Sequence, residues 1–219
     1  MNNKSTLRRP LMVALSIANL CVLTFYVSGR TSTRSQEPEL PGDERLVTRG
    51  FGPKGEPLEF SDVKVKGKSV RLNKKFEGEG EWLKELNLSL RNKSDKAITF
   101  AALHVDFPET KTLGGAMVMH PVYVGQDPSN NPSPARPPLR LGPGESVEIS
   151  LAADFELIKR SVETYRPVDQ IREVVIRLDR VMFEDGTLYS GGGLFKRNPD
   201  KSSPRKWVLV SDYPPPAQH

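Results

Sequence analysis

Hydrophobic and polar residues alternate along much of the chain after Phe60. The clearest run is LNLSLR at Leu86–Arg91, in which every second residue is a leucine. A period of two places the apolar side chains on one face of a strand and the polar side chains on the other. Val63–Val70 alternates in the same way on both sides of Gly67, which predicts a β-hairpin. The pattern therefore predicts a β-rich domain in which the three leucines are buried.

Further strand-like runs follow, and one segment between them has a helical pattern. In Asp154–Glu163 the apolar residues recur at a spacing of three to four, and Asp154 stands where a side chain caps the first turn of a helix. Pro, Gly, Asn and Asp separate the remaining runs, as expected for turns. The other predicted strands are Ile98–Phe107, Val147–Leu151, Ile171–Phe183, Leu188–Phe195 and Trp207–Val210.

Two segments carry a resemblance to a known family. LNLSLRNKSDKAI (Leu86–Ile98) and LGPGESVEISL (Leu141–Leu151) resemble the strand, Asn-rich turn, strand and Pro-Gly turn, strand pattern of immunoglobulin-like domains in bacterial envelope proteins. The resemblance implies an immunoglobulin-like β-sandwich over about Val63–Val210. Together with the hydrophobic pattern, it predicts an all-β domain at residues 60–210 with one short helix. Such domains share an architecture and a tendency to bind macromolecules, but no common chemistry.

The N-terminus has the layout of an export signal. Lys4, Arg8 and Arg9 precede an apolar run, Leu11–Val27, whose 17 residues fit the short end of a membrane-spanning helix and the long end of a signal peptide. Residues 1–29 are therefore predicted to be a signal anchor, or a signal peptide cleaved near Gly29. Positive charge before the run predicts a cytoplasmic N-terminus and a domain outside the inner membrane. The alternative is a periplasmic or secreted protein released by cleavage.

The segments on either side of the predicted domain have no sustained apolar period. Residues 30–59 mix charge with Pro and Gly and are predicted to be a flexible linker, although Leu46, Val47 and Phe51 are candidates for packing on the domain. Residues 211–219 are rich in proline and are predicted to form a disordered tail.

Charge and cysteine usage narrow the class of protein. The net charge is +5 and the pI about 9.3, but the three basic residues before the apolar run account for most of the excess. No basic stripe with interleaved aromatic residues follows, so nucleic acid is not an expected partner. The single cysteine, Cys21, lies within the apolar run. A domain without disulfides favours a bacterial envelope protein over a cysteine-stapled secreted one.

No catalytic or metal-binding signature stands out, and no cofactor is expected. The three histidines occur outside HExxH or comparable frames. His104 and Asp106 share one face of a predicted strand, and Glu77–Glu81 alternates acidic residues with glycine, but both patterns are more often structural than metal-binding. The alternative function that the residues leave open is an extracytoplasmic hydrolase that uses His104 or His120 with carboxylates.

The longest interruption of the strand pattern, Pro108–Arg140, is the candidate binding segment. The pattern of its apolar half, Met117–Val124, is compatible with a strand or with an exposed patch. Its proline-rich half is expected to lie on the surface. The sequence thus predicts a non-catalytic, membrane-tethered envelope protein that binds a partner protein or an envelope polymer. The residues predicted to bind are Met117, Met119, His120, Tyr123 and Arg136.

Overall fold

The computed structural model describes residues 43–53, 55–127 and 136–213. All of them belong to one compact unit that begins at Glu39. The N-terminal apolar run, residues 30–42 of the predicted linker and the last six residues of the predicted tail lie outside the described residues. Within the described ranges, no helix has the length and apolar character needed to cross a membrane.

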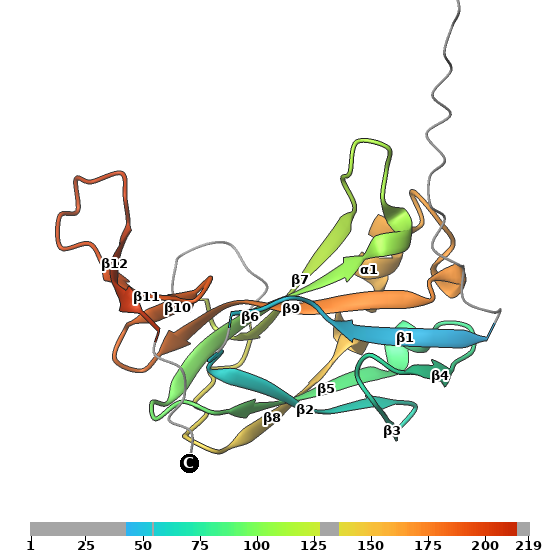
Figure 1. Ribbon diagram of the computed structural model, residues 1–219, viewed down its shortest axis with the longest axis horizontal. Helices are drawn as coiled ribbons and strands as arrows, with labels where there is room; N and C mark the ends of the chain where they lie inside the picture. Colours follow the sequence, from blue (N-terminus) through green and yellow to red (C-terminus); the bar gives the residue numbers. More distant parts are fainter. Residues whose placement is uncertain (1–42, 54, 128–135, 214–219) are drawn as a thin grey trace, which may run out of the picture. The chain divides into compact units, whose positions relative to one another are not determined.

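The larger of two β-sheets is built around strand β9, which has neighbours along both edges (Figure 1). β6 pairs with β9 on one side and carries β7 as its outer neighbour. β1 and β10 share the other side of β9, and β4, β11 and β12 continue the sheet outward from them. The strands are β1 (Glu44–Arg49), β4 (Lys75–Glu77), β6 (Ile98–Phe107), β7 (Val118–Gly125), β9 (Glu173–Phe183), β10 (Leu188–Ser190), β11 (Gly193–Arg197) and β12 (Trp207–Asp212).

The smaller sheet contains β3 (Lys68–Val70), β2 (Leu58–Val65), β5 (Leu86–Asn92) and β8 (Ser146–Ser150), in that spatial order. The predicted hairpin is confirmed, because Val63 pairs with Val70 across a two-residue turn. Lys66 and Gly67 form that turn with positive φ angles of 51° and 75°, as a primed hairpin turn requires.

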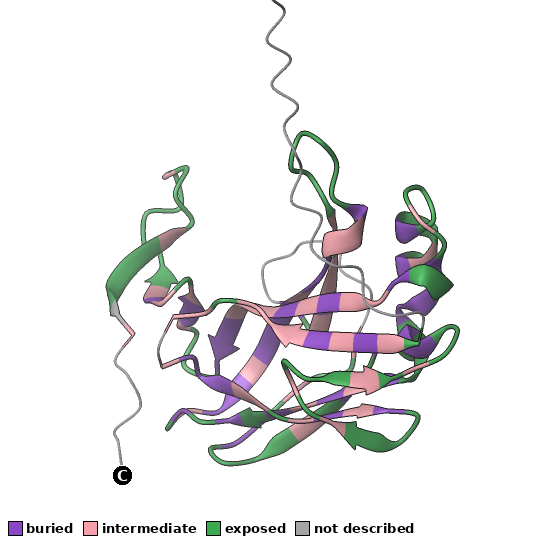
Figure 2. Ribbon diagram, turned by 45° about the vertical axis from the view of Figure 1, so that its right-hand side comes forward, coloured by how far each residue is buried: buried purple, intermediate pink, exposed green. Residues whose placement is uncertain are grey.

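The two sheets pack face to face and bury one continuous core between them (Figure 2). Leu86, Leu88 and Leu90 are fully buried on the inner face of β5, as predicted. Val174 and Ile176 meet the core from the opposite sheet. The predicted all-β sandwich is confirmed at this level of description.

Short helices gather at the end of the sandwich where β9 begins (Figure 1). The predicted helix is present as α1 (Phe155–Val162), and Phe155, Ile158 and Val162 are buried on one of its faces. Trp82 begins one 3₁₀ turn and is also buried, and its indole Nε1 donates a 2.7 Å hydrogen bond to the carbonyl oxygen of Ile171. The 3₁₀ turns are η1 (Trp82–Glu85), η2 (Pro108–Thr110), η3 (Leu151–Ala153) and η4 (Val168–Gln170).

The domain begins earlier than the sequence pattern indicates, because part of the predicted linker is strand β1. Val47 is fully buried and pairs with Val174 in parallel with β9. The other inward position of β1 is Arg45, which is 3% exposed, so the strand has no alternation of apolar residues to recognise. Phe51, a candidate for packing, is instead 95% exposed.

The C-terminal part also differs from the prediction. The single strand expected over Leu188–Phe195 is a hairpin of β10 and β11, which turns at Gly191 and Gly192 with φ angles of 58° and 87°. Two successive residues with positive φ favour glycine. β12 continues to Asp212, inside the predicted tail.

The two segments that carry the sequence resemblance meet at Asn92. Its amide Nδ2 donates to the carbonyl oxygens of Lys96 (2.8 Å) and Leu141 (2.9 Å). Its Oδ1 accepts hydrogen bonds from the backbone nitrogen and the hydroxyl of Ser94. One buried side chain therefore holds the turn after β5 against the turn before β8.

Replacing Leu88 tests the register of the core. Leu88→Ala removes a fully buried side chain, so we expect the free energy of unfolding to fall by about 2–5 kcal/mol. Ser89→Ala, on the opposite face of β5, is the matched control and should change it by less than about 0.5 kcal/mol. Denaturant titration of both variants measures the difference, and equal costs would contradict the register.

Candidate functional site

Strand β7 carries three of the five predicted binding residues and divides them between two faces of the larger sheet. Met119 and Tyr123 lie opposite Asp106 and Ala102 of β6, on the outer face. His120 lies opposite Val105 and therefore faces the interior. Met117 precedes the strand and is partly exposed. The candidates therefore do not form one site.

On the outer face, Tyr123 is part of a small packed cluster. Its ring stacks on Phe100 at a centroid separation of 6.0 Å. The guanidinium of Arg180 lies 5.8 Å from the centre of the Phe100 ring and makes a 3.1 Å ion pair with the buried carboxylate of Asp127. Tyr123 therefore packs against its neighbours and offers only part of its surface to a partner.

The neighbouring part of the outer face is dominated by the ion pair between Asp106 and Arg177. Arg177 Nε lies 2.6 Å from one oxygen of Asp106, and Nη2 lies 3.2 Å from the other. This hydrogen bonding raises the pKa of Arg177 above its ordinary value. Nη2 also lies 3.5 Å from the sulfur of Met119, which fixes this methionine beside the ion pair.

A metal site at His104 and Asp106, a sequence pattern that is more often structural, would have to compete with this ion pair. The nearest carboxylate to His104 Nε2 is that of Asp179, at 3.9 Å. Among the described residues, no group of three or more His, Cys, Asp or Glu side chains is placed to hold a metal ion. His104 and His120 lie on opposite faces of the sheet, so they belong to separate environments.

Arg136, His120 and Asp154 come together at the edge of the sandwich, where α1 begins. Arg136 Nη2 lies 2.7 and 3.0 Å from the two carboxylate oxygens of Asp154, which is 5% exposed. His120 Nε2 is buried and makes no hydrogen bond to a described residue. Burial lowers the pKa of His120, and the positive charge of Arg136 lowers it further, against the opposing effect of Asp154. The neutral form of His120 is thus favoured in the folded protein.

This cluster corrects the role that the sequence pattern predicts for Asp154. Asp154 was expected to cap α1, but its side chain accepts no capping hydrogen bond and pairs with Arg136 instead. The proline-rich half is predicted to lie on the surface, and the structure describes it only at its two ends. Asp127 and Arg136, on either side of residues 128–135, are both tied to the domain by ion pairs with buried carboxylates. Residues 128–135 lie outside the described residues.

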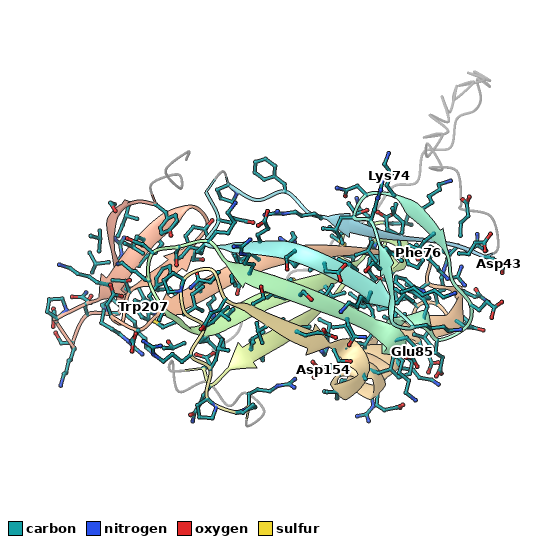
Figure 3. All side chains as sticks on the ribbon, turned by 90° about the horizontal axis from the view of Figure 1, so that it is seen from below. Asp43, Lys74, Phe76, Glu85, Asp154 and Trp207 are labelled. Carbon is teal, nitrogen blue, oxygen red and sulfur yellow. The ribbon has the colours of Figure 1, made fainter. Side chains whose placement is uncertain are left out.

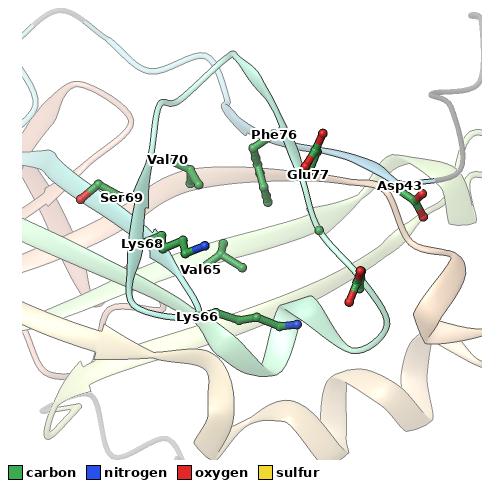
Figure 4. Close-up of a pocket in the computed structure, with 10 residues that line it drawn as sticks. Asp43, Val65, Lys66, Lys68, Ser69, Val70, Phe76 and Glu77 are labelled. Carbon is green, nitrogen blue, oxygen red and sulfur yellow. The ribbon is translucent and has the colours of Figure 1, made fainter.

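A groove of roughly 600 Å³ lies elsewhere, between the β2–β3 hairpin and β4 (Figure 4). Val65, Val70 and Phe76 form its apolar floor, and Phe76 meets the ring of Trp82 edge to face at 5.6 Å. Lysines from the hairpin and carboxylates from β4 and the start of β1 flank the floor. Asp43 and Phe76 can also be found in Figure 3. The charged residues that line it are Asp43, Lys66, Lys68, Glu77 and Glu79.

The groove offers apolar contact between charges of opposite sign, but its lining includes no histidine or cysteine. Its one hydroxyl, Ser69 Oγ, donates to Asp62 at 3.3 Å. Sequence reasoning missed this groove because it tested Glu77–Glu81 only as a metal site and otherwise treated it as structural. The signal was Phe76, an aromatic residue directly before the acidic run.

No known protein family, curated protein or solved structure matches the chain. The function is therefore inferred from the exposed side chains of the domain.

The lowered pKa of His120 predicts a pH-dependent stability. The unfolded chain binds a proton near the ordinary histidine value of 6.5, while the folded chain binds it only at lower pH. Acidification therefore favours the unfolded state through this window. We expect the melting temperature of the wild type to fall relative to that of His120→Gln between about pH 7.5 and about pH 5.5. Thermal unfolding of both proteins across this range tests it, and parallel curves would refute the buried neutral histidine.

Proposed function

We propose that this protein is a non-catalytic, membrane-tethered protein of the bacterial envelope. Its β-sandwich binds a partner protein or an envelope polymer through the β6–β7 hairpin. The basic residues before Leu11–Val27 support a domain held outside the inner membrane. The immunoglobulin-like pattern of the two matching segments supports a binding role, since such domains are used as docking modules on many unrelated proteins.

The observation that carries the proposal is the apolar tip of the β6–β7 hairpin. Leu113 is 97% exposed, and Met117 and Met119 are 43% and 49% exposed. Large apolar side chains gathered on one projection mark interaction surfaces more often than isolated ones do. Figure 2 shows this hairpin rising from the sheet as an exposed loop.

Hydrogen bonds hold the hairpin in a fixed conformation. The backbone nitrogen of Thr112 donates to Ala116 at 2.8 Å, and that of Gly115 donates to Thr112 at 2.9 Å. At the base, the buried hydroxyl of Thr110 donates to the Phe107 carbonyl (2.7 Å) and accepts from the Val118 nitrogen (2.8 Å). A loop that is already ordered loses less entropy on binding.

The hairpin is also tied to the centre of the larger sheet. The carboxylate of Glu109 accepts hydrogen bonds from the backbone nitrogens of Arg172 (2.8 Å) and Glu173 (3.3 Å), at the start of β9. A binding loop mounted on a rigid scaffold in this way keeps its side chains in position. Leu113 and Met117 are thus displayed by a supported loop.

The topology is tested by protease digestion. With the domain outside the inner membrane, protease added to intact spheroplasts should digest it and leave cytoplasmic proteins intact. The fragment that stays with the membrane should be small enough to end before β1. Protection of the domain until the membrane is dissolved would place it on the cytoplasmic side and remove the envelope assignment.

The binding role is tested with a photo-crosslinking amino acid at position 113 in native envelopes. We expect a discrete crosslinked species, identified by mass spectrometry, whose yield falls about tenfold in Met117→Ser/Met119→Ser, as for loss of one dominant contact. The matched control is the same crosslinker at Phe51, which is 95% exposed on another loop and should capture no such species.

Two outcomes would contradict the proposal. Equal capture from positions 113 and 51 would show that exposure alone explains the crosslink. A measurable turnover that His104→Ala or His120→Ala abolishes, with the fold intact, would replace the binding role by the hydrolase alternative.

A further inference from the structure

The positive charge of the domain is concentrated in the β11–β12 hairpin. The stretch Lys196–Lys206 contains five basic residues and one acidic residue. From Asp43 to the C-terminus, the residues outside this stretch comprise 22 basic and 24 acidic residues. The hairpin is therefore strongly cationic, whereas the rest of the domain has a slight negative charge.

Four basic side chains of this hairpin differ from those on other exposed surfaces in their ion pairing. Elsewhere, Lys96 pairs with Asp185 at 2.7 Å, and Arg140 pairs with Glu184 at 3.2 Å. Within the described residues, four of the five hairpin cations form no ion pair. They are Lys196, Lys201, Arg205 and Lys206.

The loop that carries these charges is organised by its own hydrogen bonds. The side chain of Asn198 donates to the Arg205 carbonyl (2.9 Å) and accepts from the Asp200 nitrogen (3.0 Å). Asp200 in turn accepts from the nitrogen and hydroxyl of Ser202 at 2.9 and 2.6 Å. The only carboxylate of the loop is thus used locally, and Lys196, Lys201, Arg205 and Lys206 remain available to an external anion.

Apolar residues lie directly beside this charge. Val208, Leu209 and Val210 are 37–55% exposed on β12, an outer strand of the larger sheet. Trp207 is half-buried, and the guanidinium of Arg197 lies 4.7 Å from the centre of its ring. Basic side chains next to aliphatic residues and a tryptophan are the combination that binds the interface of an anionic bilayer.

We propose that the β11–β12 hairpin docks on an anionic membrane surface. The inference rests on the proposed membrane tether. Only 15 residues separate Val27 from Asp43, and they span at most about 50 Å, so an anchored domain stays next to the bilayer. Asp43 and Trp207 lie at opposite ends of the domain (Figure 3). The tether and the hairpin then hold the domain to the membrane at two points.

Trp207 reports the contact directly. The only other tryptophan, Trp82, is fully buried in the core, so Trp207→Phe measures the background fluorescence. The full chain is reconstituted into phosphatidylcholine vesicles with or without phosphatidylglycerol, both containing brominated lipid as quencher. We expect quenching of Trp207 only with phosphatidylglycerol. In Lys201→Glu/Arg205→Glu/Lys206→Glu it should fall to the Trp207→Phe background, and in Leu209→Ser it should be weakened.

The charge-matched control is Lys66→Glu/Lys68→Glu on the smaller sheet, which should be quenched like the wild type. Circular dichroism establishes that each variant is folded. Trp207 quenching that is absent, or equal in both lipids, overturns the proposed contact between the hairpin and the membrane. Crosslinking of the hairpin to an acidic protein without quenching of Trp207 overturns it as well. Flotation of the vesicles at high salt tests the tether separately, because protein that fails to float lacks the N-terminal anchor whatever Trp207 reports.

Discussion

The structure depends on β9, a strand that must be hydrogen-bonded along both edges while its inner face is buried. β6 satisfies one edge, and β1 and β10 share the other. Because an unpaired backbone group in this position is costly, the segments that pair with β9 are fixed in place. β6 then positions β7 and its exposed hairpin, and β10 positions β11 and β12. Both proposed contact surfaces are thus extensions of strands that β9 holds.

The sequence predicts correctly those helices and strands that have one face in the core and the other face exposed to solvent. Leu86–Arg91, the β2–β3 hairpin and α1 all show the periodicity of their structure. The prediction fails at β1, where an inward position is Arg45. Burial and the charge of Arg172 lower the pKa of this arginine, and its Nη2 donates to the Asp169 carbonyl at 3.4 Å. Because Asp169 and Arg172 are distant in sequence, the residues around Arg45 show no pattern that would predict its burial.

The candidate site shows a similar limit. Alternation along a strand sets Met119 and His120 on opposite faces, and this separation is readable from the sequence once β7 is accepted as a strand. The meeting of His120, Arg136 and Asp154 is not readable, because three separate segments supply the residues. Asp154 also carried a plausible local role as a helix cap. The ion pair with Arg136 takes the place of that role. A buried carboxylate without a cation costs more free energy than the loss of one helix cap.

The parallel pairing of β1 with β9 has a consequence for the order in which the chain can fold. Leu46 and Val47 emerge early during synthesis, yet their partners Glu173 and Val174 follow more than a hundred residues later. The larger sheet therefore cannot close until most of the domain has been made. The proposed export of the domain in an unfolded state would benefit from such a delay, because translocation could finish before the final strand pairing forms.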